Sequence, residues 1–405
     1  MHLDVLLNRV YAVSRVVISG LGVTSCLGST VDSYWAALMR AVSMPVEVRD
    51  KYARMDNKLL YAIADHAPVA APDGFGRLGR TSTFAVTAAR DAWHDAGLDP
   101  ASMANAGVAI GTGVGDTSLY EDVPGGGPHP QGLEAYPFKV SSVLAAEFGL
   151  TGPICSASTA CSASGYAVSL AAEMIRDGEA DVMLAGGADG YTRVGVACFN
   201  RMGALDPLRC RPFDAARQGT VFGEGAALMV LESEEHARAR GHTAWYGAVE
   251  GSGWSCDGFH ATAPDEGARQ IIRAMREALA EAGIEPDRLG CVVPHGTGTP
   301  LNDAIESQAL RKALGEHSGS VGMYSLKGML GHTGGAAAAF AILTGALILR
   351  HGVIPPNAPI DRPDPDCSLS LHTGQSRALP SRHVLVNAYA FGGNNISLII
   401  GREPR

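Results

Sequence analysis

Short apolar runs that end in glycine-rich turns alternate along the chain with longer stretches of helical periodicity. Val16 to Ser25 and Gly107 to Gly115 are runs of the first kind, and they predict buried strands. Arg80 to Ala96 repeats its apolar residues at helical spacing and stops at Gly97, where glycine commonly ends a helix. This alternation indicates an α/β fold in which helices cover a mixed or parallel sheet.

The chain also repeats itself weakly, with four segments in the same order in both halves. The matched pairs are Val16 to Ser25 with Trp245 to Ser255, Gly107 to Gly115 with Cys291 to Thr299, the helix after Cys161 with Gly334 to Arg350, and Asp181 to Gly187 with His383 to Gly393. The alternative is chance similarity between glycine-rich strand ends. Because the order is kept over four segments, we interpret the chain as two halves, residues 15–242 and 243–405, after an N-terminal extension of residues 1–14.

Composition sets limits on the function. The 405 residues can bury a large core, as one domain or two. Hydrophobic residues make up 46% of the chain, and its net charge of −9 gives no reason to expect nucleic acid or an anionic membrane as a partner. No uninterrupted apolar run reaches about 18 residues, so we expect no membrane span. The first 14 residues carry no secretory signal pattern.

Cys161 has the most informative surroundings of the eight cysteines, which form no CxxC pairs and are expected to be free thiols in a reducing cytoplasm. Small residues flank it from Ser158 to Gly165, and an apolar-periodic stretch, Tyr166 to Ile175, follows. The thiol is therefore expected near a helix N-terminus, where unpaired N–H groups and the helix dipole favour the thiolate. The plain alternative is a small core residue.

Two of the thirteen histidines lie in equally marked surroundings. His295 begins the segment His-Gly-Thr-Gly-Thr, and His332 ends the segment Lys-Gly-Met-Leu-Gly-His. A lone histidine is more often structural than catalytic. One cysteine and two histidines from distant segments are, however, typical of covalent thioester chemistry. We therefore expect Cys161, His295 and His332 to meet in the fold.

These segments and several others occur in the order and spacing of one known family. They are Thr159 to Ser164, Arg211 to Asp214, Gly223 to Ala226, His295 to Thr299, Asn302 with Asp303, Glu306, Lys327, Gly331 with His332, and Asn387 to Asn394. From Val16 to Gly401 the chain resembles the β-ketoacyl-acyl carrier protein synthases, the condensing enzymes of fatty acid and polyketide synthesis. The resemblance implies a thiolase-like fold of two duplicated βαβαβαββ halves in a five-layered αβαβα core, usually a dimer.

The resemblance also implies a mechanism. Cys161 would be the nucleophile that receives an acyl group from a carrier or coenzyme A thioester. His295 and His332 would bind and decarboxylate a malonyl thioester, and the enolate would attack the acyl group on Cys161. Because the substrates travel on the phosphopantetheine of an acyl carrier protein, and two imidazoles can stabilise an enolate without a metal, we expect no resident cofactor and no metal.

Supporting residues follow from the same resemblance. The backbone N–H groups of Cys161 and Phe391 would form the oxyanion hole, and Gly392 would permit close approach of that loop. Lys327 and Glu306 would form an ion pair that orients the histidines, the alternative being a surface salt bridge.

Phe199 would line the acyl pocket, although a plain core aromatic is nearly as good an interpretation. Two features depart from the family pattern. Ala390 stands where the family usually has glycine, which would make the loop at Phe391 less able to swing. The segment from Gly113 to Tyr136 is short and rich in glycine and proline, so the sequence leaves the preferred chain length open.

Rival functions share the fold. A degradative thiolase would carry a second cysteine in Phe391 to Asn394, which contains none, and a coenzyme A-primed initiating synthase would have asparagine in place of His332. A non-catalytic partner subunit, such as a chain-length factor, would lack Cys161. An acyltransferase-type enzyme of the same fold stays open, as does the choice between a homodimer and a heterodimer with a second ketosynthase-like subunit.

Overall fold

Ten strands form the centre of the molecule. The computed structural model describes residues 14–50, 52–64, 66–99, 103, 105–121, 135–367 and 369–402. The five strands of the first half are β1 (Val16–Ser25), β4 (Gly107–Gly111), β5 (Ile154–Ala157), β6 (Val182–Asp189) and β8 (Gly225–Ser233). Those of the second half are β9 (Ala248–Cys256), β10 (Leu289–Val293), β11 (Gly322–Met323), β14 (His383–Tyr389) and β15 (Asn394–Gly401).

Both halves have the same sheet topology. The strand order is β5-β4-β6-β8-β1 in the first half and β11-β10-β14-β15-β9 in the second, and β1 and β9 join the two sheets through the pairs Val16 with Val249 and Val17 with Ala248. In each half the first three strands of that order are parallel and the last two pair antiparallel. The duplication predicted from the repeat is therefore visible in the topology. The division at residues 242 and 243 stays a prediction.

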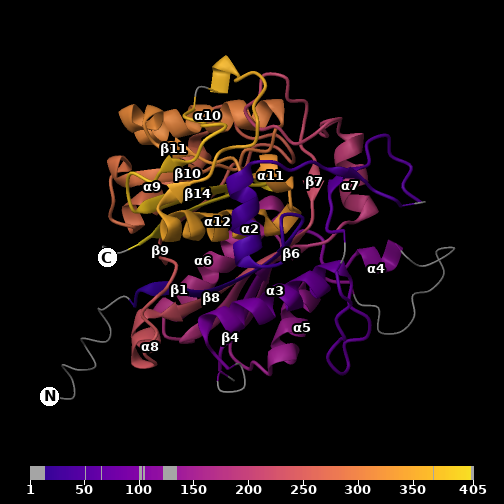
Figure 1. Cartoon of the computed structure of the whole chain (residues 1–405), viewed down its shortest axis with the longest axis vertical. Coiled ribbons are helices and arrows are strands. Elements are labelled where there is room, and N and C mark those ends of the chain that lie inside the picture. The colour runs from indigo at the N-terminus through magenta and orange to yellow at the C-terminus, as the bar shows by residue number, and fades with distance from the viewer. Residues whose placement is uncertain are drawn as a thin grey trace.

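Helices and sheets alternate in five layers (Figure 1). The outer helices of the first half are α3 (Arg80–Ala96) and α5 (Phe138–Phe148), the central pair is α6 (Ala163–Arg176) and α12 (Ala337–His351), and the outer helices of the second half are α9 (Arg269–Glu281) and α10 (Pro300–Leu314). Three hydrophobic clusters fill the spaces: one around α3 and α5, one around α6 and α12 between the sheets, and one around α9 and α10. The predicted five-layered αβαβα core is confirmed.

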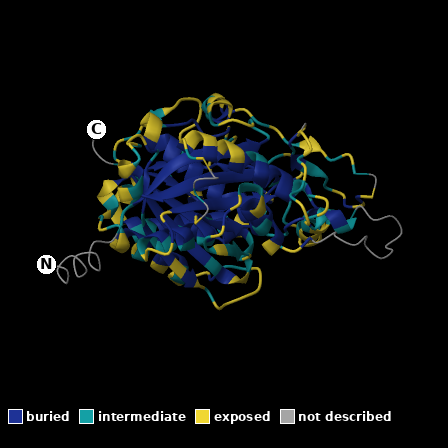
Figure 2. Cartoon of the chain, turned by 90° about the horizontal axis from the view of Figure 1, so that it is seen from below, coloured by how far each residue is buried: buried dark blue, intermediate teal, exposed yellow. Residues whose placement is uncertain are grey.

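Smaller elements surround this core. The other α-helices of the described residues are α2 (Val31–Arg40), α4 (Ser118–Glu121), α7 (Arg193–Arg201), α8 (Glu234–Ala239) and α11 (Lys327–Leu330). A three-stranded sheet comprises β2 (Val46–Glu47), β3 (Leu59–Tyr61) and β7 (Phe222–Gly223), and a two-stranded one comprises β12 (Val353–Ile354) and β13 (Arg377–Ala378). Figure 2 shows that the buried residues concentrate in the large sheets and the helices between them.

The central helices approach each other closely because their contact residues are small. A Cβ atom added at Gly165 of α6 would lie 3.2 Å from Cβ of Ala338 of α12 and 2.8 Å from Cγ2 of Ile396. The segment Gly334–His351 is 18 residues long and apolar enough to span a membrane by composition alone, but 83% of it is buried inside the protein. It is therefore the core helix of the fold.

Local signals in the sequence set several helix ends. The helix predicted at Arg80 to Ala96 has those bounds, and Gly97 ends it with φ of 64°. The proline-rich segment 353–367 is mostly irregular, with β12 and a 3₁₀ turn at Pro365–Cys367 as its only regular structure. The predicted loop Val123 to Gly132 lies outside the described residues, and so does the N-terminal extension apart from Ser14.

Candidate active site

Cys161 lies in a strained turn in front of α6. The turn is a 3₁₀ segment, Ala160–Ser162, that leads directly into the helix. Ala160 has φ of 50°, a left-handed conformation that is uncommon for alanine and found where surrounding structure imposes it. Cys161 is therefore held at the helix start that the sequence predicted.

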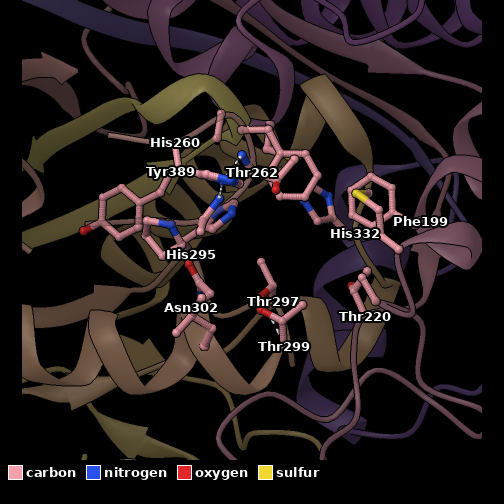
Figure 3. A pocket seen from close by; sticks show the side chains of 18 of the residues that line it. Phe199, Thr220, His260, Thr262, His295, Thr297, Thr299, Asn302, His332 and Tyr389 are labelled. Carbon is pink, nitrogen blue, oxygen red and sulfur yellow. Dashed lines mark hydrogen bonds between the residues drawn. The ribbon is translucent and has the colours of Figure 1, made fainter. Parts of the chain in front are cut away.

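The structure brings the three predicted residues together. One ligand-type atom from each of Cys161, His295 and His332, the sulfur and two ring nitrogens, lies within 4.8 Å of the other two. All three residues are buried, and the two imidazole rings meet edge to face with centroids 5.7 Å apart. Both rings face the cavity in Figure 3. Because the cysteine comes from the first half and the histidines from the second, the site exists only where the halves meet.

Two carboxylates on α10 hold the His295 loop. Glu306 accepts hydrogen bonds from the backbone N–H groups of His295 and Gly296, each at 2.7 Å. Asp303, one turn earlier, accepts those of Thr297 and Gly298 at 3.0 and 3.2 Å. Four consecutive N–H groups thus converge on one end of one helix, which fixes the position of the His295 ring.

Each catalytic imidazole has one nitrogen engaged. The Lys327 ammonium lies 3.4 Å from Nδ1 of His295, and the N–H of Gly334 donates to Nδ1 of His332 at 3.1 Å. Because an ammonium and an amide can only donate, both Nδ1 atoms accept, and the proton of each neutral ring lies on Nε2. Burial and then the charge of Lys327 hold the pKa of both histidines well below the ordinary value, so the rings are neutral.

The pKa of the Cys161 thiol differs from the one that the sequence led us to expect. Burial raises the pKa of Cys161 to about 11, although Lys327 and backbone hydrogen bonds from Cys161 and Phe391 lower it. The expectation of a favoured thiolate was therefore wrong for the unacylated protein. The helix start supplies favourable dipoles, but removal of the sulfur from water outweighs them.

Lys327 and Glu306, predicted to form an ion pair, are both buried and interact electrostatically, because, against the larger effect of burial, the ammonium lowers the pKa of the Glu306 carboxyl and the carboxylate raises the pKa of Lys327. Within the part of the chain that the structure describes, no salt bridge of 4.0 Å or less joins them, so the two charges act on each other without direct contact. Glu306 binds the backbone N–H groups at the start of the loop, whereas the ammonium donates to the carbonyl oxygen of His295. Each group contacts His295 separately: Glu306 binds its backbone N–H and Lys327 binds its carbonyl oxygen. Together they fix the orientation of this residue.

Asp189 is a site residue that the sequence analysis missed. Its buried carboxylate accepts hydrogen bonds from Thr112, Gly113 and Val114 of the first half and from the N–H of Gly335 in the second. Burial raises its pKa to about 6 against those hydrogen bonds. It joins the two halves directly behind Cys161. An acidic residue at the carboxyl end of a buried strand, β6, was the signal that could have revealed it.

The loop predicted to form the oxyanion hole lies against the thiol. Phe391–Gly393 forms a short turn in which Gly392 and Gly393 have φ of 81° and 77°, conformations that favour glycine. Ala390 is extended, with φ of −130° and ψ of 157°, so alanine fits there without strain. The Phe391 ring stacks on Phe199, with centroids 5.3 Å apart.

Two cavities meet at the catalytic group. The outer cavity, about 450 Å³, runs past His295, Thr297 and Thr299 to the exposed residues Met202 and Leu301 (Figure 3). The inner cavity, about 160 Å³, is lined mainly by apolar residues of the first half. The residues that line both are Cys161, Phe199, His332 and Phe391. Phe199 is therefore a cavity residue in the structure, as predicted, and not a plain core aromatic.

A cysteine and two histidines at this spacing could also bind a metal ion. The Lys327 ammonium at Nδ1 of His295 opposes a second positive charge in the same place. The donor set therefore fits hydrogen-bond catalysis better than metal binding.

Known proteins are similar to this chain over nearly its whole length. Residues 13–237 match the family model "Beta-ketoacyl synthase, N-terminal domain" and residues 246–361 match "Beta-ketoacyl synthase, C-terminal domain". The 3-oxoacyl-[acyl-carrier-protein] synthase 2 of Coxiella burnetii is 34% identical over 96% of this chain and 98% of its own. The tetracenomycin polyketide synthase ketoacyl synthase alpha subunit of Streptomyces glaucescens is 34% identical over 97% of this chain and 98% of its own.

Solved structures agree. The ishigamide ketosynthase/chain length factor superposes with a TM-score of 0.89 at 35% identity, covering 97% of this chain and 100% of the other. The predicted fold class, the family resemblance and the assignment as an acyltransferase-class enzyme of fatty acid or polyketide synthesis are confirmed. The chain belongs to the beta-ketoacyl synthase family.

Proposed function

We propose that the chain condenses a Cys161-bound acyl group with a malonyl-acyl carrier protein thioester, with loss of CO₂ and without a resident cofactor or metal. The observation that carries this proposal is the convergence of one thiol and two neutral imidazoles within 4.8 Å, where the inner and outer cavities meet.

Acyl transfer comes first. The sulfur of Cys161 forms a bond to the acyl carbonyl carbon, the carrier thioester C–S bond breaks, and the carrier thiol leaves with the proton of Cys161. The carbonyl oxygen carries negative charge in the transition state, and the backbone N–H groups of Cys161 and Phe391 are the donors for it. Because the pKa of the thiol is raised, its proton leaves as the C–S bond forms and not before.

Condensation uses the two histidines. Cleavage of the bond between the malonyl carboxylate and its α-carbon releases CO₂ and leaves the electron pair as an enolate. The Nε2–H groups of His295 and His332 donate hydrogen bonds to the enolate oxygen. A neutral imidazole can do this because it still carries one N–H group. The enolate carbon bonds to the acyl carbonyl carbon, the bond to Cys161 breaks, and the released thiolate takes up a proton.

The outer cavity suits a carrier arm. It extends from Cys161 to Met202 and Leu301, which are 44% and 47% exposed, so it opens to solvent. Thr297 and Thr299 line its wall and their hydroxyl groups lie 2.8 Å apart. Hydroxyl groups at this depth can bind the amides of a phosphopantetheine arm, which supports an acyl carrier protein as the donor of both substrates.

A second subunit is part of the proposal. β5 is the edge strand of the large sheet, and Ile154, Tyr136 and Phe138 are about half exposed on or beside it. An edge strand with exposed apolar residues favours pairing with another chain. One of the similar structures combines a ketosynthase with a chain length factor. We propose a homodimer or a heterodimer of this kind, working in the cytoplasm, as the eight free thiols also favour.

The test is acyl loading of the purified chain. Incubation with radiolabelled acyl-carrier thioesters should give a covalent adduct that peptide mass spectrometry maps to Cys161, and Cys161→Ala should lose it. The matched control is Cys198→Ala, which removes an exposed thiol and should load normally. Label that persists in Cys161→Ala would contradict the proposed mechanism.

A further inference from the structure

Tyr191 lies at the end of the inner cavity. The cavity is lined by Leu60, Val114, Val196, Phe199 and Phe222, together with the residues around Cys161. On the far side of the same wall lies a much larger groove of about 1120 Å³, whose lining includes Asp50, Tyr52, Ile63, Arg80 and Arg193. Among the described residues, Tyr191 is the one residue that lines both spaces.

Tyr191 is held at both of its ends. Its backbone N–H donates to Oε2 of Glu224 at 2.9 Å, and its hydroxyl donates to Oδ2 of Asp50 at 3.3 Å. Glu224 is itself fixed by Arg80, and Asp50 accepts two hydrogen bonds from Arg193 at 3.1 and 3.2 Å.

The two sides of the tyrosine differ in polarity. Asp50 and Arg193 line the outer groove, so the hydroxyl is directed there. The ring packs with Val196 and Phe222, which line the inner cavity. A side chain with its polar atom bonded on one side and its ring packed on the other forms a fixed partition.

We propose that Tyr191 is the end wall of the acyl pocket and sets the longest acyl chain that Cys161 can carry. This inference rests on the proposed function, since it takes the inner cavity as the space for the acyl chain. An unbranched, apolar chain fits the lining, because the side chains between Cys161 and Tyr191 are mainly aliphatic or aromatic. Removal of the ring joins the inner cavity to the outer groove and lets longer chains extend into it.

The test is competitive loading of the full chain with an equimolar mixture of butyryl-, octanoyl- and dodecanoyl-pantetheine, followed by mass spectrometry of the adducts on Cys161. We expect Tyr191→Ala to raise the ratio of dodecanoyl to butyryl adduct by about tenfold or more, the size of effect that a few methylenes have in an apolar pocket. Tyr191→Phe is the matched control, because it removes only the hydroxyl. Its ratio should equal that of the wild type.

The possible outcomes distinguish the end-wall role of Tyr191 from the acylation of Cys161. Tyr191→Leu provides a second test that keeps apolar packing, in case circular dichroism shows that Tyr191→Ala is unfolded. If folded Tyr191→Ala or Tyr191→Leu loads Cys161 with the wild-type ratio, or loads no thioester at all, the end-wall role is wrong while the chemistry of Cys161 stands. If the wild type forms no adduct on Cys161 with any of the three thioesters, the proposed function fails, and this inference fails with it.

Discussion

The two halves of the molecule build the same turn in front of their central helices. Thr159 has φ and ψ of −98° and 43°, and Thr333, at the matching position, has −84° and 32°. The next residues, Ala160 and Gly334, are left-handed in both halves, with φ of 50° and 57°. The backbone of the duplicated unit has therefore been kept, including its strained residue, although the side chains on it differ.

The chemistry of the two turns is different because their surroundings are. Cys161 occupies the third position of the first turn, and Gly335 occupies the third position of the second. A Cβ atom at Gly335 would lie 2.3 Å from the backbone nitrogen of Gly113, so no side chain fits. The second half carries its catalytic group earlier, at His332. Contact between the halves thus decides which turn can bear a nucleophile.

The largest expected effect on stability comes from Gly335→Ala, which places a side chain at the third position of the second turn. The added methyl group meets backbone atoms that cannot rotate away, and the N–H of Gly335 would leave Asp189. We expect a loss of about 3 kcal/mol in the free energy of unfolding, measured by urea denaturation. Gly319→Ala is the control, because a Cβ atom there has open space and should change stability little. Equal stability of both variants would refute the packing argument.

A smaller effect, on the rate of condensation, is expected from changing Glu306, the carboxylate that binds the His295 loop. Glu306→Gln keeps one acceptor oxygen but replaces the other with an amide that cannot accept, so one of the two N–H groups at His295 and Gly296 loses its partner. Condensation should fall about tenfold while acyl loading of Cys161 stays normal, as expected for a positioning residue of the second half only. Glu277→Gln, on the exposed face of α9, should change neither rate. A parallel fall in loading would show a general loss of structure.

The smallest effect concerns the protonation of the Cys161 thiol. Burial raises the pKa of Cys161 to about 11, so the thiolate fraction grows steadily with pH. We expect the rate of alkylation by iodoacetamide at Cys161 to rise with pH and to show no plateau below the ordinary thiol value of 9.0. Peptide mass spectrometry resolves this site from the other thiols. A plateau near neutral pH would mean that the turn stabilises the thiolate, as the sequence alone suggested.

Local patterns in the sequence predicted the elements that local interactions determine. The bounds of α3 follow from its periodicity and from the glycine at its end. The same holds for Cys161 at a helix start, since the small residues around it and the apolar stretch behind it are adjacent in the chain. The convergence of Cys161 with His295 and His332 was predicted from their residue types, the marked segments around them and the family resemblance.

The features that the sequence did not predict correctly depend on interactions between distant segments. The pKa of Cys161 depends on burial by both halves, which no local pattern encodes. Lys327 and Glu306 contact His295 at its carbonyl oxygen and its backbone N–H, and only the folded loop shows that their charges interact without direct contact. Asp189 binds groups 76 and 146 residues away, at Gly113 and Gly335, so its place at the end of a buried strand marks it as a candidate but does not reveal its partners.

The separate roles of Cys161 and the two histidines are tested most directly by His332→Ala. The variant keeps the nucleophile of the first half and removes one of the two enolate donors of the second. We expect the acyl adduct on Cys161 to form at the wild-type level, while the β-ketoacyl product falls at least about a hundredfold. Condensation at the wild-type rate in His332→Ala, or loss of acyl loading in a folded variant, would contradict the assignment of loading to Cys161 and decarboxylation to the two histidines.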